Sequence, residues 1–292
     1  MAQQNPALAA VLILLATAFI ASTTLLAKAL GTDALGPALS PLQISQGRFV
    51  FAFCAISTVV AVMRPRFVAP HWRVHVARTA SGWAGVTLMF AAVAFIPLGD
   101  ATAISFLNPV IAMMLAIPLL GEKIGPVRWT AAAIAVTGAV ILLRPTPASF
   151  QLPALLALGA ACAMGMELIM IKRLSRGERP LQILFINNGL GLIIASAAAA
   201  FVWRQPTVEQ WAALVALGAL MACAQTAYVN GMARADASFA APFSYATLVF
   251  AALFDAAVFG VLPDAVSVTG AAVILAGAGL LAWREARRAP GV

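Results

Sequence analysis

The chain has 292 residues, of which 63% are hydrophobic and 10% are charged, and its mean hydropathy is +0.97. A soluble globular domain carries about 25% charged residues, so this chain lacks the polar surface that a soluble protein needs. A lipid bilayer is the solvent that fits it. The net charge of +8 comes from basic residues that lie between apolar runs, which is typical of membrane topology rather than of nucleic-acid binding.

Ten stretches of the sequence are apolar and close to the length of about 20 residues that a membrane helix needs. No Lys or Arg precedes the first stretch, so we expect it to be a membrane helix and not a cleaved signal peptide. Short connections such as Arg64-Pro65-Arg66 separate the stretches. We predict an all-α integral membrane protein with ten transmembrane helices, at 7–28, 41–63, 76–96, 100–120, 126–143, 152–171, 181–203, 208–230, 237–261 and 265–283.

The 18 Lys and Arg residues are distributed unequally across the predicted membrane. Most of them lie in alternate connections and in the tail after the tenth helix, whereas Lys28, Arg144 and Arg204 lie on the opposite side. Because cytoplasmic connections carry the excess of basic residues, we expect both termini in the cytoplasm of a bacterial cell. The chain would then be a multi-pass protein of the inner membrane.

The sequence also indicates an internal duplication. Leu42-Gln43-Ile44 recurs as Leu181-Gln182-Ile183, each time at the start of the second helix of a half, and Asp100-Ala101 recurs as Asp236-Ala237. These matches divide the chain into repeats at 1–145 and 146–292. Each repeat has five helices, and because five is odd the second repeat enters the membrane inverted. Inverted repeats around a central cavity are common in secondary transporters that work by alternating access.

At this point the chain resembles a known family. Gly-Asp-Ala-Thr-Ala-Ile-Ser-Phe-Leu-Asn-Pro-Val at 99–110 and Leu-Gly-Glu at 120–122, within five plus five helices, are similar to the drug/metabolite transporter superfamily over essentially the whole chain. The second half departs from the pattern, since Val261 and not an acid follows Gly260. Within the superfamily the chain looks most like the YddG-type exporters of aromatic and other amino acids. That resemblance implies export of amino acids; the alternative is a cationic drug or multidrug exporter.

Charged side chains inside a membrane helix are costly and mark candidate functional sites. Arg48 can either face a cavity and bind a substrate carboxylate or extend to the membrane surface. Asp255 lies at a similar depth and can pair with Arg48 or take up a proton. Glu167 can pair with Lys172 and Arg173 at its helix end or bind a substrate ammonium group. We predict Arg48 and Glu167 as substrate-binding residues and Asp255 as a gating or coupling residue.

Uncharged polar and aromatic residues extend this candidate site. Asn and Gln in a membrane need partners, water or substrate, and Trp83 can line a cavity or pack in the ordinary way. Pro109 and Pro242 lie inside predicted helices and should bend them, so we predict them as gating residues. The remaining predicted substrate-binding residues are Trp83, Asn108, Asn187, Asn188, Gln225, Tyr228, Ser244 and Tyr245.

The sequence lacks the motifs of an enzyme. It has no glycine loop for phosphate, no metal-spaced His and Cys set and no Ser/His/Asp arrangement. The two histidines, His71 and His75, are predicted as a solvated pair at the cytoplasmic start of the third helix. We therefore expect no catalytic residue, metal or cofactor, and no nucleic-acid partner. The expected partners are amino-acid substrates and the lipid bilayer, for a protein that acts as a monomer, with a dimer left open.

Overall fold

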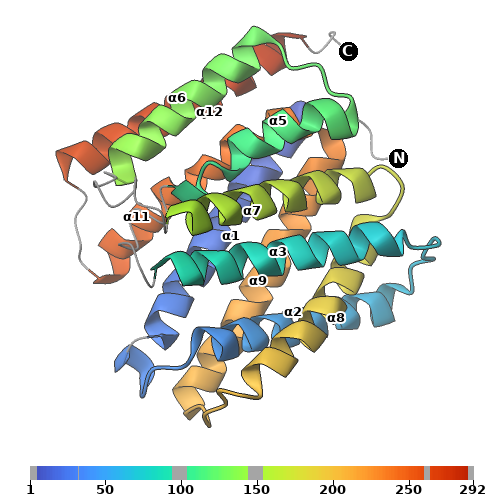
Figure 1. Ribbon diagram of the computed structural model, residues 1–292, viewed down its shortest axis with the longest axis vertical. Coiled ribbons are helices and arrows are strands. Elements are labelled where there is room, and N and C mark those ends of the chain that lie inside the picture. Colours follow the sequence, from blue (N-terminus) through green and yellow to red (C-terminus); the bar gives the residue numbers. More distant parts are fainter. Residues whose placement is uncertain (1–4, 32, 94–103, 144–153, 260–263, 289–292) are drawn as a thin grey trace.

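The computed structural model describes residues 5–31, 33–93, 104–143, 154–259 and 264–288, and every regular element in these ranges is helical (Figure 1). Five of the helices, α1, α2, α7, α8 and α9, are long and apolar enough to cross a membrane. The helices are α1 (Pro6–Leu30), α2 (Pro41–Met63), α3 (Trp72–Val93), α5 (Asn108–Leu120), α6 (Pro126–Leu143), α7 (Ala154–Leu174), α8 (Pro180–Ala199), α9 (Val208–Arg234), α10 (Ala237–Ala240), the 3₁₀ segment η3 (Ala241–Tyr245), α11 (Ala246–Phe259) and α12 (Ala265–Arg288).

Proline and polar caps explain where several helices begin. α1, α2 and α8 each start with a proline, at Pro6, Pro41 and Pro180, where the missing N–H breaks no intrahelical hydrogen bond. α9 starts with a capping box, in which Thr207 and Gln210 satisfy each other's backbone N–H groups. The observed starts lie within one residue of those predicted for these four helices.

Two predicted helices differ from the structure at a proline. The helix predicted at 100–120 appears as α5, which begins only at Asn108, so Pro109 lies in its first turn and not in its interior; residues 100–103 lie outside the described part. The helix predicted at 237–261 is interrupted at Pro242 and consists of α10, η3 and α11. Proline lacks an N–H group and clashes with the preceding turn, so a bend becomes a break at both places.

The helices pack in pairs that join distant parts of the chain. α1 packs on α9, α3 on α7, α2 on α8 and α6 on α12, with further contacts of α5 with α7 and of α1 with α11. Figure 1 shows α3 beside α7 and α6 beside α12. Glycines permit the closest approach: a Cβ atom on Gly138 of α6 would lie 2.7 Å from the backbone nitrogen of Ile274 in α12. Small residues at such contacts are typical of membrane helices.

Two glutamines hold the connections at the two ends of the bundle in the same way. Gln43 of α2 donates to the carbonyl of Arg204 at 2.5 Å and accepts from its N–H at 3.0 Å. Gln182 of α8 donates to the carbonyl of Val68 and accepts from its N–H, both at 2.9 Å. We call the end with the α2–α3 and α7–α8 connections the basic end, and the end with the α1–α2 and α8–α9 connections the opposite end.

Candidate functional site

Three adjoining cavities lie between the helices, and Arg48 and Val86 line all three. The first, of about 100 Å³, lies between α2, α3, α7, α8 and α9. The second, of about 340 Å³, lies between α1, α2, α3, α5, α7, α9 and the η3–α11 segment. The third, of about 340 Å³, reaches Gly31 and Pro41 at the opposite end. We call them together the central cavity; its size suits a small organic solute, since ligand pockets start at about 300 Å³.

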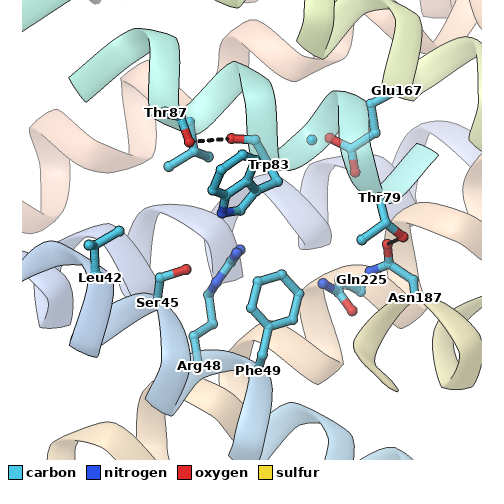
Figure 2. A pocket seen from close by; sticks show the side chains of 12 residues that line it. Leu42, Ser45, Arg48, Phe49, Thr79, Trp83, Thr87, Glu167, Asn187 and Gln225 are labelled. Atoms are coloured by element: carbon cyan, nitrogen blue, oxygen red, sulfur yellow. Dashed lines mark hydrogen bonds between the residues drawn. The ribbon is translucent and has the colours of Figure 1, made fainter. Parts of the chain in front are cut away.

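Arg48 faces the central cavity, which is the first of the two alternatives that the sequence left open for it. Figure 2 shows its side chain reaching from α2 toward Trp83 of α3, with Phe49 beside it. The guanidinium carbon lies 4.4 Å from the centroid of the Phe49 ring, a cation–π distance. Within the described part of the chain, the Arg48 side chain makes no hydrogen bond or ion pair. It is therefore a cation available to a solute.

Glu167 of α7 also lines the cavity, and its partner differs from the one predicted. Arg78 of α3 places Nε 3.9 Å from Glu167 Oε1, and its terminal nitrogen donates to the Ile183 carbonyl at 3.4 Å. A pair with Lys172 is wrong because residues five apart lie on different faces of a helix. Lys172 instead donates to the carbonyls of Met232, at 2.9 Å, and of Ala235.

Arg78 lines the second cavity and is not among the predicted site residues. Because α3 begins at Trp72, Arg78 lies within this helix and inside the bundle, 2% exposed. Its place inside the predicted segment 76–96 was the available signal. The glycine one turn further on, Gly82, makes room for the Glu167 carboxyl group: a Cβ atom there would lie 2.8 Å from Oε2.

The predicted amide residues divide into a lining group and a supporting one. Asn187 lines the first cavity and accepts a hydrogen bond from Thr79 at 3.1 Å, and Gln225 lies beside it (Figure 2). Asn188 is fully buried behind the wall, where it donates to the Leu184 carbonyl at 2.9 Å and to Gln225 Oε1 at 2.7 Å. Asn188 therefore orients Gln225, whose amide N–H groups remain as donors for the cavity.

The other predicted site residues are mostly in the cavity wall. Trp83 lines the first cavity, and Asn108, Pro109, Tyr228 and Ser244 line the second. Tyr245, which was predicted to bind substrate, instead packs in the core. It is 1% exposed, and its ring centroid lies 6.1 Å from that of Phe106. Pro242 is buried away from the wall, and the side chain of Asp255 lies outside the described residues, so its pairing with Arg48 stays a prediction.

At the basic end, the two histidines meet Glu178 in one polar cluster. The side chain of His71 is solvated as predicted, with 65% of it exposed, whereas that of His75 is buried. The Glu178 carboxylate accepts from the His71 backbone N–H at 2.8 Å and from Gln182 Nε2 at 2.8 Å; His71 Nδ1 lies 3.0 Å and His75 Nε2 2.8 Å from its oxygens. Burial alone would raise the pKa of Glu178, but these hydrogen bonds outweigh it and hold the pKa below its ordinary value. His75 is fully buried because the carboxylate is its partner.

Further polar contacts close the basic end around α10. Arg128 of α6 pairs with Asp236 at 3.1 Å, and Glu122 accepts from the Ala237 backbone N–H at 2.9 Å. Glu122 belongs to the Leu-Gly-Glu motif, so this motif joins the end of α5 to the start of α10. Together with Lys172, these residues connect α5, α6, α7, α9 and α10 at the basic end. The third cavity extends toward the opposite end.

Helices that cross a membrane around a buried polar cavity define a multi-pass membrane transporter, and comparison with known proteins agrees. The EamA-like transporter family matches residues 7–144 and again residues 151–283. The chain belongs to this family, and the expectation that it is no enzyme is confirmed by its transporter relatives.

Two similar proteins and one solved structure show the range of the likeness. The chain is 30% identical to a riboflavin transporter of Vibrio cholerae over 73% of this chain and 72% of that protein. It is 27% identical to an S-adenosylmethionine uptake transporter of Rickettsia bellii over 82% of this chain and 83% of that one. A solved structure titled only as the crystal structure of a protein shares the fold, with a TM-score of 0.80 at 20% identity, 98% coverage of this chain and 100% of that one. The finer resemblance to amino-acid exporters is not among these findings.

Proposed function

We propose that the protein is a secondary transporter that exports amino acids and related small metabolites across the bacterial inner membrane by alternating access. The observation that carries the proposal is that one cavity wall holds both a cation and a carboxylate, Arg48 on α2 and Glu167 on α7. A zwitterion needs both a cation for its carboxylate and a carboxylate for its ammonium group. S-adenosylmethionine, the cargo of one relative, itself contains an α-amino carboxylate.

The proposal includes two inverted five-helix repeats, at 1–145 and 146–292, with both termini in the cytoplasm. The family matches twice, at 7–144 and 151–283. Gln43 and Gln182, which correspond in the repeated Leu-Gln-Ile, bind a connection in the same way at opposite ends. Exchanging the halves also turns the α1–α9 pair into α7–α3 and the α5–α7 pair into α11–α1, all of which pack together. These observations support a two-fold relation, and with it alternating access.

Riboflavin is a second candidate solute, favoured by the sequence likeness to a riboflavin transporter and by aromatic side chains in the wall, such as Trp83 and Phe106. A cationic drug is disfavoured. Of the described side chains that line the central cavity, two arginines, Arg48 and Arg78, face a single carboxylate, Glu167, and like charges repel.

Transport into liposomes that contain only the purified protein tests the proposal. Labelled phenylalanine, methionine, riboflavin and a cationic dye are offered separately, with and without a proton gradient. We expect amino-acid uptake above that of empty liposomes, lost in Arg48→Ala and retained in Arg66→Gln, a matched change at an exposed arginine outside the cavity. Uptake of riboflavin and of no amino acid would show that riboflavin, the second candidate, is the solute. Movement of the dye alone would overturn both.

A further inference from the structure

The central cavity carries an excess of positive charge. Arg48 and Arg78 line it with Glu167 as the one acidic side chain among the described lining residues. Arg78 is 2% exposed and lies 3.9 Å from Glu167, so these two charges largely offset each other. Arg48 is then the charge left over, next to the Phe49 ring and without an ion pair in the described part of the chain. A charge in an apolar setting without a partner is costly.

Several polar groups of the wall present hydrogen-bond donors to the cavity, although Asn108 uses its own N–H to donate to the Ser105 carbonyl. The two guanidinium groups have no acceptor capacity, and Gln225 presents its N–H groups because its oxygen accepts from Asn188. Tyr228 and Ser244 add hydroxyl groups, which can also donate. Asn187 uses its oxygen to accept from Thr79, which likewise leaves its N–H groups to the cavity side. A solute rich in acceptors and poor in donors complements such a wall.

The position of Glu167 limits what it can offer to a solute. Its carboxyl group rests against α3, where a Cβ atom on Gly82 would lie 2.8 Å from Oε2, and Arg78 lies next to Oε1. An ammonium group that binds Glu167 must therefore compete with the neighbouring guanidinium group. A carboxylate that binds Arg48 meets no competing anion of this kind. The two halves of a zwitterion are thus not recognised equally.

We propose that the preferred solute carries one net negative charge, a monocarboxylate whose carboxylate binds Arg48, and that an α-ammonium group is not required. The inference rests on the proposed function, because it takes the central cavity as the transport site. A monoanion offsets the one excess positive charge of the described lining side chains, whereas a zwitterion leaves that charge in place. Acidic metabolites without an amino group, such as aryl or 2-oxo acids, would then be better cargo than the matching amino acids.

Three solutes with the same aromatic body test the charge directly: phenylpropionate, phenylalanine and phenethylamine. Binding to the purified protein is measured by thermal stabilisation and by competition against the labelled solute that the liposomes take up. We expect phenylpropionate to bind most tightly and phenethylamine at least about tenfold more weakly, since unfavourable charge contacts cost several kcal/mol. The opposite order, equal affinities, or no binding of phenylpropionate overturns the inference.

Two variants separate recognition of the carboxylate from recognition of an ammonium group. Arg48→Gln should weaken phenylpropionate binding at least about tenfold, whereas Arg66→Gln should leave it unchanged. Glu167→Gln should tighten phenylpropionate binding, because it releases Arg78 and removes an anion. If Glu167→Gln instead weakens phenylalanine binding and leaves phenylpropionate unchanged, Glu167 binds the ammonium group and the inference is wrong.

The proposed function can fail separately from this inference. If wild-type protein transports none of the offered solutes, the transport proposal fails whatever binds. If it transports phenylalanine while phenylpropionate neither binds nor competes, transport stands and only the charge preference is overturned. Circular dichroism and the melting temperature of each variant without solute show that a loss of binding is not a loss of fold.

Discussion

At the scale of single residues, two of the described charged side chains inside the bundle have neighbouring groups that compensate them. Lys172 donates to two backbone carbonyls at the end of α9, and Arg78 pairs with Glu167 and reaches the Ile183 carbonyl. Glycine provides the space for one of these arrangements, at Gly82. Arg48 differs from them because a ring and a cavity surround its guanidinium group, which is why its role is proposed to be binding.

The space at Gly82 gives a first prediction. In Gly82→Ala the new Cβ atom would lie 2.8 Å from Glu167 Oε2, so the carboxyl group must move away from α3. Displacements of about 1 Å in a binding site can lower rates by about a hundredfold, and we expect transport to fall at least about tenfold with little change in melting temperature. Gly125→Ala is the control, since a Cβ atom there meets nothing within 4 Å. Full activity of Gly82→Ala would show that the position of Glu167 is unimportant.

The Glu178 cluster gives a second prediction, on pH. Hydrogen bonds to the carboxylate lower the pKa of Glu178, so its stabilisation is fully present above the ordinary carboxyl pKa of about 4.3. It is lost as the pH falls through the lower pKa of the folded state. We expect Glu178→Gln to unfold at a lower temperature than wild type at neutral pH. The free energy of unfolding should fall by about 1–3 kcal/mol.

Thermal unfolding in detergent from neutral pH to about pH 3 checks the sign of this effect. The difference between wild type and Glu178→Gln should shrink as the medium becomes more acidic. A difference that stays constant, or that grows toward low pH, would mean that the carboxylate is not the form that stabilises the basic end.

At the scale of elements, the helices owe their places to close contacts between small residues and to ties between connections. α6 and α12 approach so closely that Gly138 and Gly277 face backbone atoms of the other helix. The glutamines Gln43 and Gln182 act across more than one element, since each fixes a peptide group in a distant connection. Apolar surface cannot select helix partners in a bilayer, because lipid is as apolar as the helices. Packing shape and polar ties select them instead.

The α6–α12 contact gives a third prediction. Gly138→Ala would place its Cβ atom 2.7 Å from the Ile274 nitrogen and 2.8 Å from the Gly270 carbonyl oxygen, and backbone atoms cannot rotate away. We expect a loss of about 1–3 kcal/mol, as for other overpacked sites. Gly279→Ala on α12 meets nothing within 4 Å, so it should gain about 0.5–1 kcal/mol from the better helix propensity of alanine. The test is to measure the melting temperatures of the two variants in the same detergent. Equal values would contradict the close approach of α6 and α12 at Gly138.

At the scale of the whole molecule, the two ends of the bundle are built differently. The basic end is tied by charged groups, among them Glu178, Lys172 and the Arg128–Asp236 pair. Among the described residues of the opposite end, the ties between distant connections come from neutral groups, as in the hydrogen bond from Gln210 to the Pro37 carbonyl at 2.9 Å. The third cavity reaches that opposite end. The structure is therefore that of a carrier whose cavity extends away from the basic end.

Orientation in the membrane gives a fourth prediction. If the basic end is cytoplasmic, as the positive-inside rule requires, a green fluorescent protein fused after Val292 should fluoresce in cells. Alkaline phosphatase fused after Arg204, at the opposite end, should be active in the periplasm, and the same enzyme fused after Arg66 should be inactive. The reverse pattern of activities would mean that the basic end faces the periplasm. The proposed membrane orientation would then be wrong.

The sequence by itself determined the class of protein and most of its helices. Twenty apolar residues can satisfy their backbone groups in lipid only as a helix, so hydropathy gave both ends of α2 and the starts of α1 and α9 to within one residue. It also placed Arg48 and Gln225 in the cavity wall, because buried polar groups in a membrane need a polar neighbour. Family membership followed from motifs that are local in the chain.

Only the tertiary structure decided which groups meet. The partner of Glu167 is Arg78, that of His75 is Glu178 and that of Asn188 is Gln225. The local pattern cannot show these contacts, since each depends on how two helices rotate against each other. The same rotation put Tyr245 in the core, though it lies next to Ser244 in the wall. Hydropathy indicates which segments can cross the membrane, whereas the mutual packing of the helices decides which side chains share the cavity.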